Sequence, residues 1–368
     1  MGKMRLGVFF GGRSGEHEVS LLSARSVINA LDKDRYQVIE IGITKNGEWL
    51  TGPNALQAFE QEATSNLVPV LMVPEPGNFK LYQRTEGKLF EPYLEIDAAF
   101  PMLHGTFGED GTLQGLFELA EIPYIGAGVL ASAVAMDKGL FKYVMRANDI
   151  PVLDWVVLTD VGYKQDMQAG LDHAEALGAY PLFTKPANMG SSVGIMRCEN
   201  RSDLIEGVQQ ALAYDRRVLV ERGLVAREIE ISVLGNEDPT ASVVGEIVPS
   251  DTFYSYKAKY VDDASELFIP ARIDETLAQT AQRIAIAAYK ATDCAGMARV
   301  DFLLEQGTQR LFLNEINTLP GFTKISMYPK LWEASGLTYS ALLDRLVEFG
   351  IARHAQRSQL TRSYGEAL

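Results

Sequence analysis

The feature that most constrains the fold lies near the C-terminal end of the chain, in residues 299–326. Two apolar runs rich in strand-forming residues, 297–304 and 310–316, flank a polar turn around Gly307. This pattern predicts a β-hairpin with a longer loop. The two strands must therefore pair with one another, and their side chains must alternate between two faces.

Polar side chains gather on one face of this predicted hairpin. Arg299 and Asp301 share a face, and strand pairing would bring Asp301 opposite Glu315 and Asn317. Two carboxylates and an amide oxygen are hard ligands that suit Mg²⁺, with substrate phosphates completing the shell. The alternative is an ordinary polar face of an antiparallel sheet. The turn at Gly321 that follows supplies backbone N–H donors.

Length and composition bound the remaining possibilities. A chain of 368 residues predicts two or three domains. No apolar run reaches membrane-spanning length, and no signal-peptide pattern follows Met1, so we expect a cytoplasmic protein without a membrane partner. The two cysteines and four histidines show no zinc or disulfide spacing. A net charge of −14 argues against a nucleic-acid partner and requires a local basic pocket for any anionic substrate.

Two strand–turn–helix corners occur in the first third of the chain. Apolar runs at 6–10 and 96–103 each lead into a glycine-rich turn and a helix, which is how α/β domains build ligand sites. The first turn carries Glu16, and the second carries His104 and Glu109. The alternatives are an acid favoured by the helix dipole and a packing or capping histidine. Residues 44–95 look irregular, with weak hairpin signals.

A glycine-rich loop in the middle of the chain has the composition of a phosphate-binding loop. Lys185 is followed by the glycine-flanked pair Ser191 and Ser192, whose hydroxyl and N–H groups are suited to phosphate oxygens. It is not a Walker loop, because no Lys-Ser/Thr follows the last glycine. Ser192 also matches the G-x-S-x-G motif of serine hydrolases, but that motif needs a helix where 193–196 predicts a strand.

Two further segments carry weaker signals. Residues 126–131 match the dinucleotide fingerprint G-x-G-x-x-A, yet Pro151 stands near the place where the expected acid would lie. We interpret the match as accidental, although it supports an NAD-dependent dehydrogenase as a rival. The polar and aromatic residues 251–263 predict a surface loop that acts as a lid, or a plain solvated loop.

Taken together, these motifs resemble the D-alanine–D-alanine ligase family of the ATP-grasp superfamily over residues 5–350. The matching segments are GGRSGEHEVS, HGTFGEDGTLQG, MDK, KPANMGSSVG, VERGLVAREIE, FYSYKAKY, GMARVDF and NEINTLPGFTKISMYPK. The resemblance implies an α/β, three-domain ATP-grasp fold with a Rossmann-like N-terminal domain. It places a substrate domain at 1–125, a central subdomain at 126–224 and a C-terminal subdomain at 225–368.

The resemblance also implies a nucleotide and metal site. It implies two Mg²⁺ ions, with Mn²⁺ as a possible substitute, held by Asp301, Glu315 and Asn317. The ATP contacts that it implies are Lys138 and Lys185 at the α- and β-phosphates, Lys259 at the γ-phosphate, Glu221, Leu224 and Glu228 around the adenosine, and Ser192 and Asn314 in the same site.

The implied reaction joins two D-alanine molecules through a D-alanyl phosphate, for peptidoglycan precursor synthesis by a cytoplasmic homodimer. The resemblance implies that Arg299 and the Gly321 N–H stabilise the oxyanion, and that Ser326 binds the carboxylate of the second D-alanine. The first D-alanine and the lid would involve Glu16, His104, Glu109, Ser191, Lys259 and Tyr260. Tyr260 favours the dipeptide over a D-lactate product. A non-catalytic nucleotide sensor and a ligase for other amino acids are the remaining alternatives.

Overall fold

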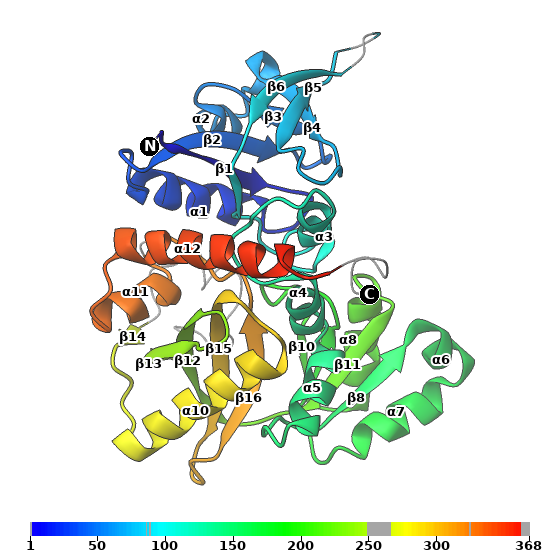
Figure 1. Ribbon diagram of the computed structural model, residues 1–368. Helices are drawn as coiled ribbons and strands as arrows, with labels where there is room; N and C mark the ends of the chain where they lie inside the picture. The colour runs from blue at the N-terminus through cyan, green and yellow to red at the C-terminus, as the bar shows by residue number, and fades with distance from the viewer. Residues whose placement is uncertain (1, 86, 88–89, 249–265, 324, 362–368) are drawn as a thin grey trace.

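The computed structural model describes residues 2–85, 87, 90–248, 266–323 and 325–361. Three β-sheets follow one another along the chain, with seven, four and five strands among the described residues. Helices cover the sheets, and the long helix α12 (Tyr339–Ser358) lies between the N-terminal sheet and the rest of the molecule (Figure 1). The α/β class predicted from the sequence is confirmed.

The first sheet is built around parallel strands. β1 (Met4–Gly11) lies between β2 (Tyr36–Ile43) and β7 (Ala98–Pro101), and all three run in the same direction. β1 packs both of its faces into hydrophobic cores, as expected for a buried parallel strand. Helix α1 (His17–Ala30) follows β1, and α3 (Thr112–Leu119) follows β7. The two predicted corners therefore lie at the same edge of the sheet.

The expectation of an irregular segment at 44–95 is wrong. The chain there forms β3 (Trp49–Thr51), α2 (Ala55–Glu60), a 3₁₀ turn (Thr64–Asn66), β4 (Val68–Met72), β5 (Lys80–Gln83) and β6 (Glu91–Glu95). These short strands extend the sheet in antiparallel pairing beyond β2. Their shortness and their prolines concealed them, and Pro92 lies in the exposed edge strand, where a missing N–H is tolerated.

The second sheet is antiparallel and follows a helical segment. Its strands are β8 (Trp155–Thr159), β9 (Leu182–Pro186), β10 (Met196–Cys198) and β11 (Arg217–Arg222). The helices are α4 (Val129–Met136), α5 (Lys138–Ala147), α6 (Asp160–Gln165), α7 (Met167–Glu175) and α8 (Arg201–Leu212).

Neither rival motif has the structural context that it needs. The glycines at 126–128 lead into α4 and then directly into α5, instead of the second parallel strand of a dinucleotide fold. Ser192 is followed by turn residues and by β10, where a nucleophile elbow requires a helix.

The third sheet contains the predicted hairpin. Its strands are β12 (Ala226–Gly235), β13 (Thr240–Val248), β14 (Glu266–Phe268), β15 (Gly296–Glu305) and β16 (Leu311–Asn317). Helix α10 (Glu275–Ala291) packs on one face, and α11 (Met327–Ala334), which was not predicted, follows the hairpin. Buried residues of α4 and α5 share this core, and α11 covers part of the opposite face, where Ser232 on β12 donates to the Tyr328 carbonyl.

Candidate nucleotide and amino-acid site

The hairpin register confirms the predicted pairing of polar residues. Asp301 pairs with Glu315, and Arg299 pairs with Asn317. A bulge then shifts the register by one residue, with Asn314 as the extra position. Leu313 and Ile316 can therefore both face the core, although they are three residues apart. The bulge also turns Asn314 and Glu315 to the same cavity.

This cavity, of about 410 Å³, lies between the second and third sheets. Its wall comes from β9 and β11 on one side and from β12, β13, β15 and β16 on the other. Ten residues of the predicted site line it: Lys138, Lys185, Ser191, Ser192, Glu221, Leu224, Glu228, Asp301, Asn314 and Glu315. The structure thus brings together residues that lie up to 177 positions apart in the sequence.

A buried carboxylate between two lysines forms one end of the cavity. Glu221 on β11 pairs through Oε2 with Lys185 Nζ at 2.6 Å and through Oε1 with Lys142 on α5. Burial alone would raise the pKa of a carboxyl group, but the two ammonium groups hold the pKa of Glu221 at about 2. Burial opposes the charge on Lys185 as well, yet Glu221 raises its pKa above the ordinary value. Glu221 and Lys185 are therefore ionised at neutral pH, whereas burial lowers the pKa of Lys142 against the opposing effect of Glu221.

The predicted phosphate loop is tied to the start of α5. Lys138 donates through Nζ to the Met189 carbonyl at 2.6 Å, and its backbone N–H donates to Ala187. Ser191 and Ser192 both adopt the left-handed conformation, with φ of 50° and 59°. Non-glycine residues rarely adopt this conformation, so the neighbouring contacts must hold the loop in place. The loop presents its backbone and hydroxyl groups to the cavity in the arrangement that anion binding needs.

Arg299 lines a second, smaller cavity and contacts Asp301, which lines the larger one. Its guanidinium donates to both oxygens of Asp301, at 2.8 and 2.7 Å, and lies 3.0 Å from Oε2 of Glu230 on β12. Glu230 and Asp301 are register partners on adjacent strands, and both are buried. Asn317 also donates to Asp301, at 2.9 Å. One arginine is thus held between two carboxylates.

The smaller cavity, of about 60 Å³, adjoins the first and is lined by residues from all three sheets' loops. Nine residues of the predicted site line it: Glu16, His104, Glu109, Lys138, Ser191, Arg299, Glu315, Asn317 and Gly321. Lys138, Ser191 and Glu315 belong to both cavities. A small molecule here would therefore be in contact with the contents of the larger cavity.

Glu16 is a site residue by its contacts rather than a helix cap. It occupies the N-cap position of α1, but its side chain caps no helix N–H. Instead, its carboxylate accepts a hydrogen bond from the Ser191 hydroxyl of the phosphate loop. Gly190 and Gly105 pass so close that a Cβ on either would lie 2.9 or 2.5 Å from Oε2 of Glu16. A side chain at either glycine would therefore collide with the Glu16 carboxylate.

His104 connects the first sheet to the turn after the hairpin. Its Nδ1 lies 3.0 Å from the Leu319 carbonyl and its Nε2 lies 2.8 Å from Ser23 Oγ. A carbonyl cannot donate, so Nδ1 carries the proton and Nε2 accepts from Ser23 in the neutral ring. Burial lowers the pKa of His104 and favours this neutral form. Both predicted roles, packing and site lining, therefore apply to the same side chain.

Glu109 lies beside His104 with no lysine or arginine paired to it among the described residues. Its Oε2 accepts the Gly105 N–H at 2.6 Å. Burial and the neighbouring Glu16 carboxylate raise the pKa of Glu109 to about 8. The Glu16 carboxylate thus opposes the ionisation of Glu109, and a positively charged ligand would relieve this opposition.

The remaining predicted residues either line neither cavity or lie outside the residues that the structure describes. Ser326 is the N-cap residue of α11, and a Cβ on Gly321 would lie 2.9 Å from its Oγ, so the two are adjacent. Ser326 Oγ accepts from the Thr323 N–H at 3.1 Å. Lys259 and Tyr260, with the whole predicted lid, lie outside the described residues.

The hairpin residues fit a divalent cation that arrives with a phosphate ligand. Within the described ranges, no three His, Cys, Asp or Glu side chains are clustered to hold a metal ion by themselves. Asp301, Glu315 and Asn317 supply two carboxylates and one amide oxygen on one face. This is the incomplete set from which Mg²⁺ binds when phosphates supply the remaining ligands.

Sequence analysis missed two buried charges of the site, Lys142 and Glu230. Lys142 lies on a helix with many charged neighbours, and Glu230 lies in an alternating strand, so each looked like an ordinary surface residue. The spacing of Lys142 four residues after Lys138, on the same face of α5, was the available signal.

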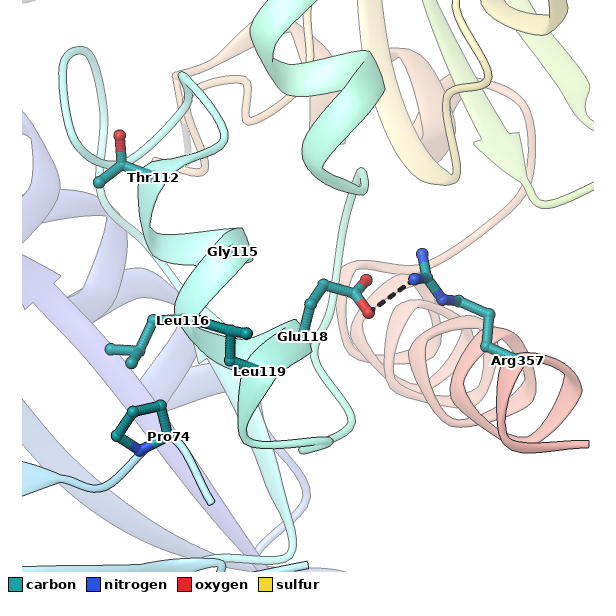
Figure 2. Close-up of a pocket in the computed structure, with 7 residues that line it drawn as sticks. All are labelled: Pro74, Thr112, Gly115, Leu116, Glu118, Leu119 and Arg357. Carbon is teal, nitrogen blue, oxygen red and sulfur yellow. Dashed lines mark ion pairs between the residues drawn. The ribbon is translucent and has the colours of Figure 1, made fainter. Parts of the chain in front are cut away.

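A larger hollow of about 660 Å³ lies elsewhere, beside α3 (Figure 2). It is lined by Pro74, Thr112, Gly115, Leu116, Glu118, Leu119 and Arg357, with an ion pair of 3.1 Å between Glu118 and Arg357. It has the larger volume but includes no residue of the predicted site. We therefore place the functional site at the two adjoining cavities.

Comparisons with known proteins identify the family to which the chain is similar. A family model described as D-ala D-ala ligase N-terminus matches residues 5–127, and one described as D-ala D-ala ligase C-terminus matches 144–348. The D-alanine–D-alanine ligase of Natranaerobius thermophilus is 45% identical over 368 residues, which is 100% of each chain. That of Thermoanaerobacter sp. (strain X514) is 48% identical over 97% of this chain and 99% of its own.

Solved structures give the same result. The D-alanine-D-alanine ligase from Coxiella burnetii has a TM-score of 0.83 and 37% identity, and the match covers 99% of each chain. The VanG D-Ala:D-Ser ligase from Enterococcus faecalis has a TM-score of 0.84 and 34% identity, covering 95% of this chain and 100% of the other. The three sheets described above are therefore arranged as in these ligases.

Proposed function

The chain belongs to the D-alanine–D-alanine ligase family, and on that premise we propose how its residues carry out the family's reaction. The chain has the ATP-grasp fold and is an ATP-dependent ligase that joins two D-alanine molecules and uses a divalent metal. The products are D-alanyl-D-alanine, ADP and phosphate, and the dipeptide enters peptidoglycan synthesis. The three sheets support domain boundaries at 1–125, 126–224 and 225–368.

One contact carries the assignment of residues. Glu16, from the first sheet, accepts a hydrogen bond from Ser191 of the phosphate loop, so the amino-acid cavity and the nucleotide cavity meet there. The larger cavity takes ATP. Lys138 and Lys185 bind its α- and β-phosphates, with Ser192 and Asn314 beside them, and Glu221, Leu224 and Glu228 surround the adenosine.

Asp301, Glu315 and Asn317 hold two Mg²⁺ ions, for which Mn²⁺ can substitute, and bound cations neutralise the phosphate charge during transfer. The γ-phosphate passes to the carboxylate of the first D-alanine, whose ammonium is bound by Glu16. His104 and Glu109 complete the wall around that substrate. A carboxylate is a poor electrophile, and the acyl phosphate formed in this way has a good leaving group.

The second step forms the peptide bond. The neutral amine of the second D-alanine, held through its carboxylate by Ser326, attacks the acyl carbon, and phosphate leaves. Arg299 and the Gly321 N–H donate to the oxyanion of the tetrahedral intermediate, where preorganised donors have their largest effect. From the resemblance, we assign Lys259 to the γ-phosphate and Tyr260 to the hydrogen-bonded group around Glu16.

Two further properties are proposed from the family resemblance, namely a homodimer and a cytoplasmic location. No described helix is both long enough and apolar enough to cross a membrane. Sedimentation of the purified chain tests the dimer, which a purely monomeric profile would contradict.

The deciding experiment measures phosphate release from Mg-ATP and identifies the product by mass. D-alanine alone should give the dipeptide, and L-alanine should give none. The neighbour named as a D-Ala:D-Ser ligase makes D-serine the second candidate acceptor, so D-serine and D-lactate are supplied with D-alanine in parallel. No release with D-alanine by folded, ATP-binding protein would leave the fold intact and contradict the substrate assignment.

A further inference from the structure

A completely buried lysine supports the nucleotide cavity without lining it. The Lys142 side chain is 2% exposed, and its ammonium pairs with Oε1 of Glu221, which is equally buried. Glu221 and Lys185 line the cavity, whereas Lys142 does not. The carboxylate therefore has one lysine behind it, in the protein interior, and one in front, at the cavity surface.

The positions of the three groups are fixed by their elements. Glu221 and Lys185 lie on neighbouring antiparallel strands, with Lys185 opposite Leu219, two residues from Glu221 and on the same face. Lys142 approaches from α5, where it also lies 5.8 Å from the Trp155 ring. Two lysines and one glutamate carry a formal charge of +1, which complements an incoming anion.

Phosphate binding creates a conflict at this cluster. Lys185 is held by Glu221 at 2.6 Å, yet its proposed role requires it to bind ATP phosphates. If Lys185 were the sole partner of Glu221, its transfer to a phosphate would leave a buried carboxylate unpaired, which is strongly unfavourable. Lys142 removes the conflict, because it remains paired with Glu221 while Lys185 is redirected.

We propose that Lys142 is a positioning residue of the nucleotide site, which holds Glu221 in place so that Lys185 is available to phosphate groups. This inference rests on the proposed assignment of the cavity to ATP. It predicts that Lys142 affects ligands that carry phosphates more strongly than adenosine, because contact of adenosine with Glu221 does not require Lys185 to leave that carboxylate.

The test compares ATP with adenosine in Lys142→Met, which keeps the length and apolar stem of the side chain. Dissociation constants are measured by calorimetry or by competition for ATP and for adenosine. We expect the ATP constant to rise about tenfold or more and the adenosine constant to rise by a clearly smaller factor, so that the ratio of the ATP constant to the adenosine constant increases. Equal weakening of both ligands would indicate a purely structural role and overturn the proposal, as would no change in either.

A matched control is available one turn along the same helix. Arg146 lies 4.2 Å from the same Trp155 ring but pairs with Asp154 at the surface. Arg146→Met should leave the ratio of the two constants unchanged. A shift in this variant equal to that of Lys142→Met would overturn the proposal.

A second variant keeps the test decisive if Lys142→Met folds poorly. The double variant Lys142→Met/Glu221→Gln leaves no buried carboxylate for Lys185 to neutralise. Its ratio of ATP to adenosine constants should equal that of Glu221→Gln alone, and a change in this ratio as large as that caused by Lys142→Met in the wild type would overturn the proposal. Failure of the wild type to bind ATP would instead contradict the proposed function itself.

Discussion

Two glutamates that line adjoining cavities, Glu221 and Glu109, have opposite electrostatic surroundings. Glu221, in the nucleotide cavity, lies between two lysines, which hold its pKa at about 2. Glu109, in the amino-acid cavity, has an acid as its charged neighbour, and burial together with Glu16 raises its pKa to about 8. The same side chain is thus fixed as an anion in one cavity and kept largely neutral in the other.

The difference matches what each cavity must receive. A nucleotide brings negative charge, and in the nucleotide cavity the Glu221 carboxylate is paired with two lysines, of which Lys185 lines the cavity. A zwitterionic amino acid brings its own ammonium group. In the amino-acid cavity, no lysine or arginine of the described residues pairs with the carboxylate of Glu16 or Glu109. The substrate ammonium therefore supplies a positive charge for Glu16 and Glu109, and three substitutions test this contrast.

The largest effect is expected at Arg299, in the wall between the cavities. Arg299→Gln removes the proposed oxyanion donor and leaves Asp301 and Glu230 facing each other without a cation. We expect kcat to fall about 10²- to 10³-fold, the usual cost of losing one oxyanion donor. Steady-state kinetics measure the change, and circular dichroism verifies that the variant is folded.

Arg272→Gln is the matched control for Arg299. Arg272 also pairs with a buried acid of the same sheet, Glu246, at 3.0 Å, but Arg227 shares that acid. Its kcat should remain within about twofold of the wild type. A comparable fall of kcat in both variants would indicate that the effect comes from a less stable sheet and not from the loss of an oxyanion donor.

A smaller and more selective effect is expected at Glu16. Glu16→Gln removes the charge proposed to bind the ammonium of D-alanine but keeps the shape of the side chain. A hydrogen bond to a charged group contributes about 1.5–3 kcal/mol, so KM for the first D-alanine should rise about 10- to 100-fold. KM for ATP should be nearly unchanged, because the nucleotide cavity retains its own charge pairs.

Glu18→Gln provides the comparison for Glu16 two residues along α1. Glu18 pairs with Lys45 on the surface, and both side chains are more than half exposed. This variant should behave as the wild type. Equal increases in KM for ATP and D-alanine in Glu16→Gln would contradict the division of roles between the cavities.

The extent to which the sequence predicts this site depends on the kind of element. Asp301, Glu315 and Asn317 could be placed because strand alternation converts spacing into geometry, and Glu16 and His104 because parallel strands end at one edge. The bulge at Asn314 breaks that alternation, and nothing in the local sequence marks it. Lys142 and Glu230 escaped because only tertiary packing decides whether a charged residue on a helix or strand is buried.

The smallest effect concerns stability and follows from the raised pKa of Glu109. In the unfolded chain its carboxyl ionises near its ordinary pKa of 4.5, and in the folded protein near 8. Between these values the folded state binds the proton more tightly, so stability falls as pH rises from about 4.5 and the loss is complete above about 8. Each pKa unit corresponds to about 1.4 kcal/mol, and we expect at least that much between pH 5 and pH 9.

Glu109→Gln removes this titration, so its stability relative to the wild type should increase steadily from pH 5 to pH 9. Thermal or urea unfolding at several pH values in that range measures the difference. Glu206→Gln, which removes an exposed acid on α8, should follow the wild type at every pH, because its carboxyl is in water in both states. Parallel profiles for Glu109→Gln and the wild type would mean that Glu109 ionises as an ordinary carboxyl. The amino-acid cavity would then hold two anions before D-alanine arrives, and the contrast with Glu221 would be lost.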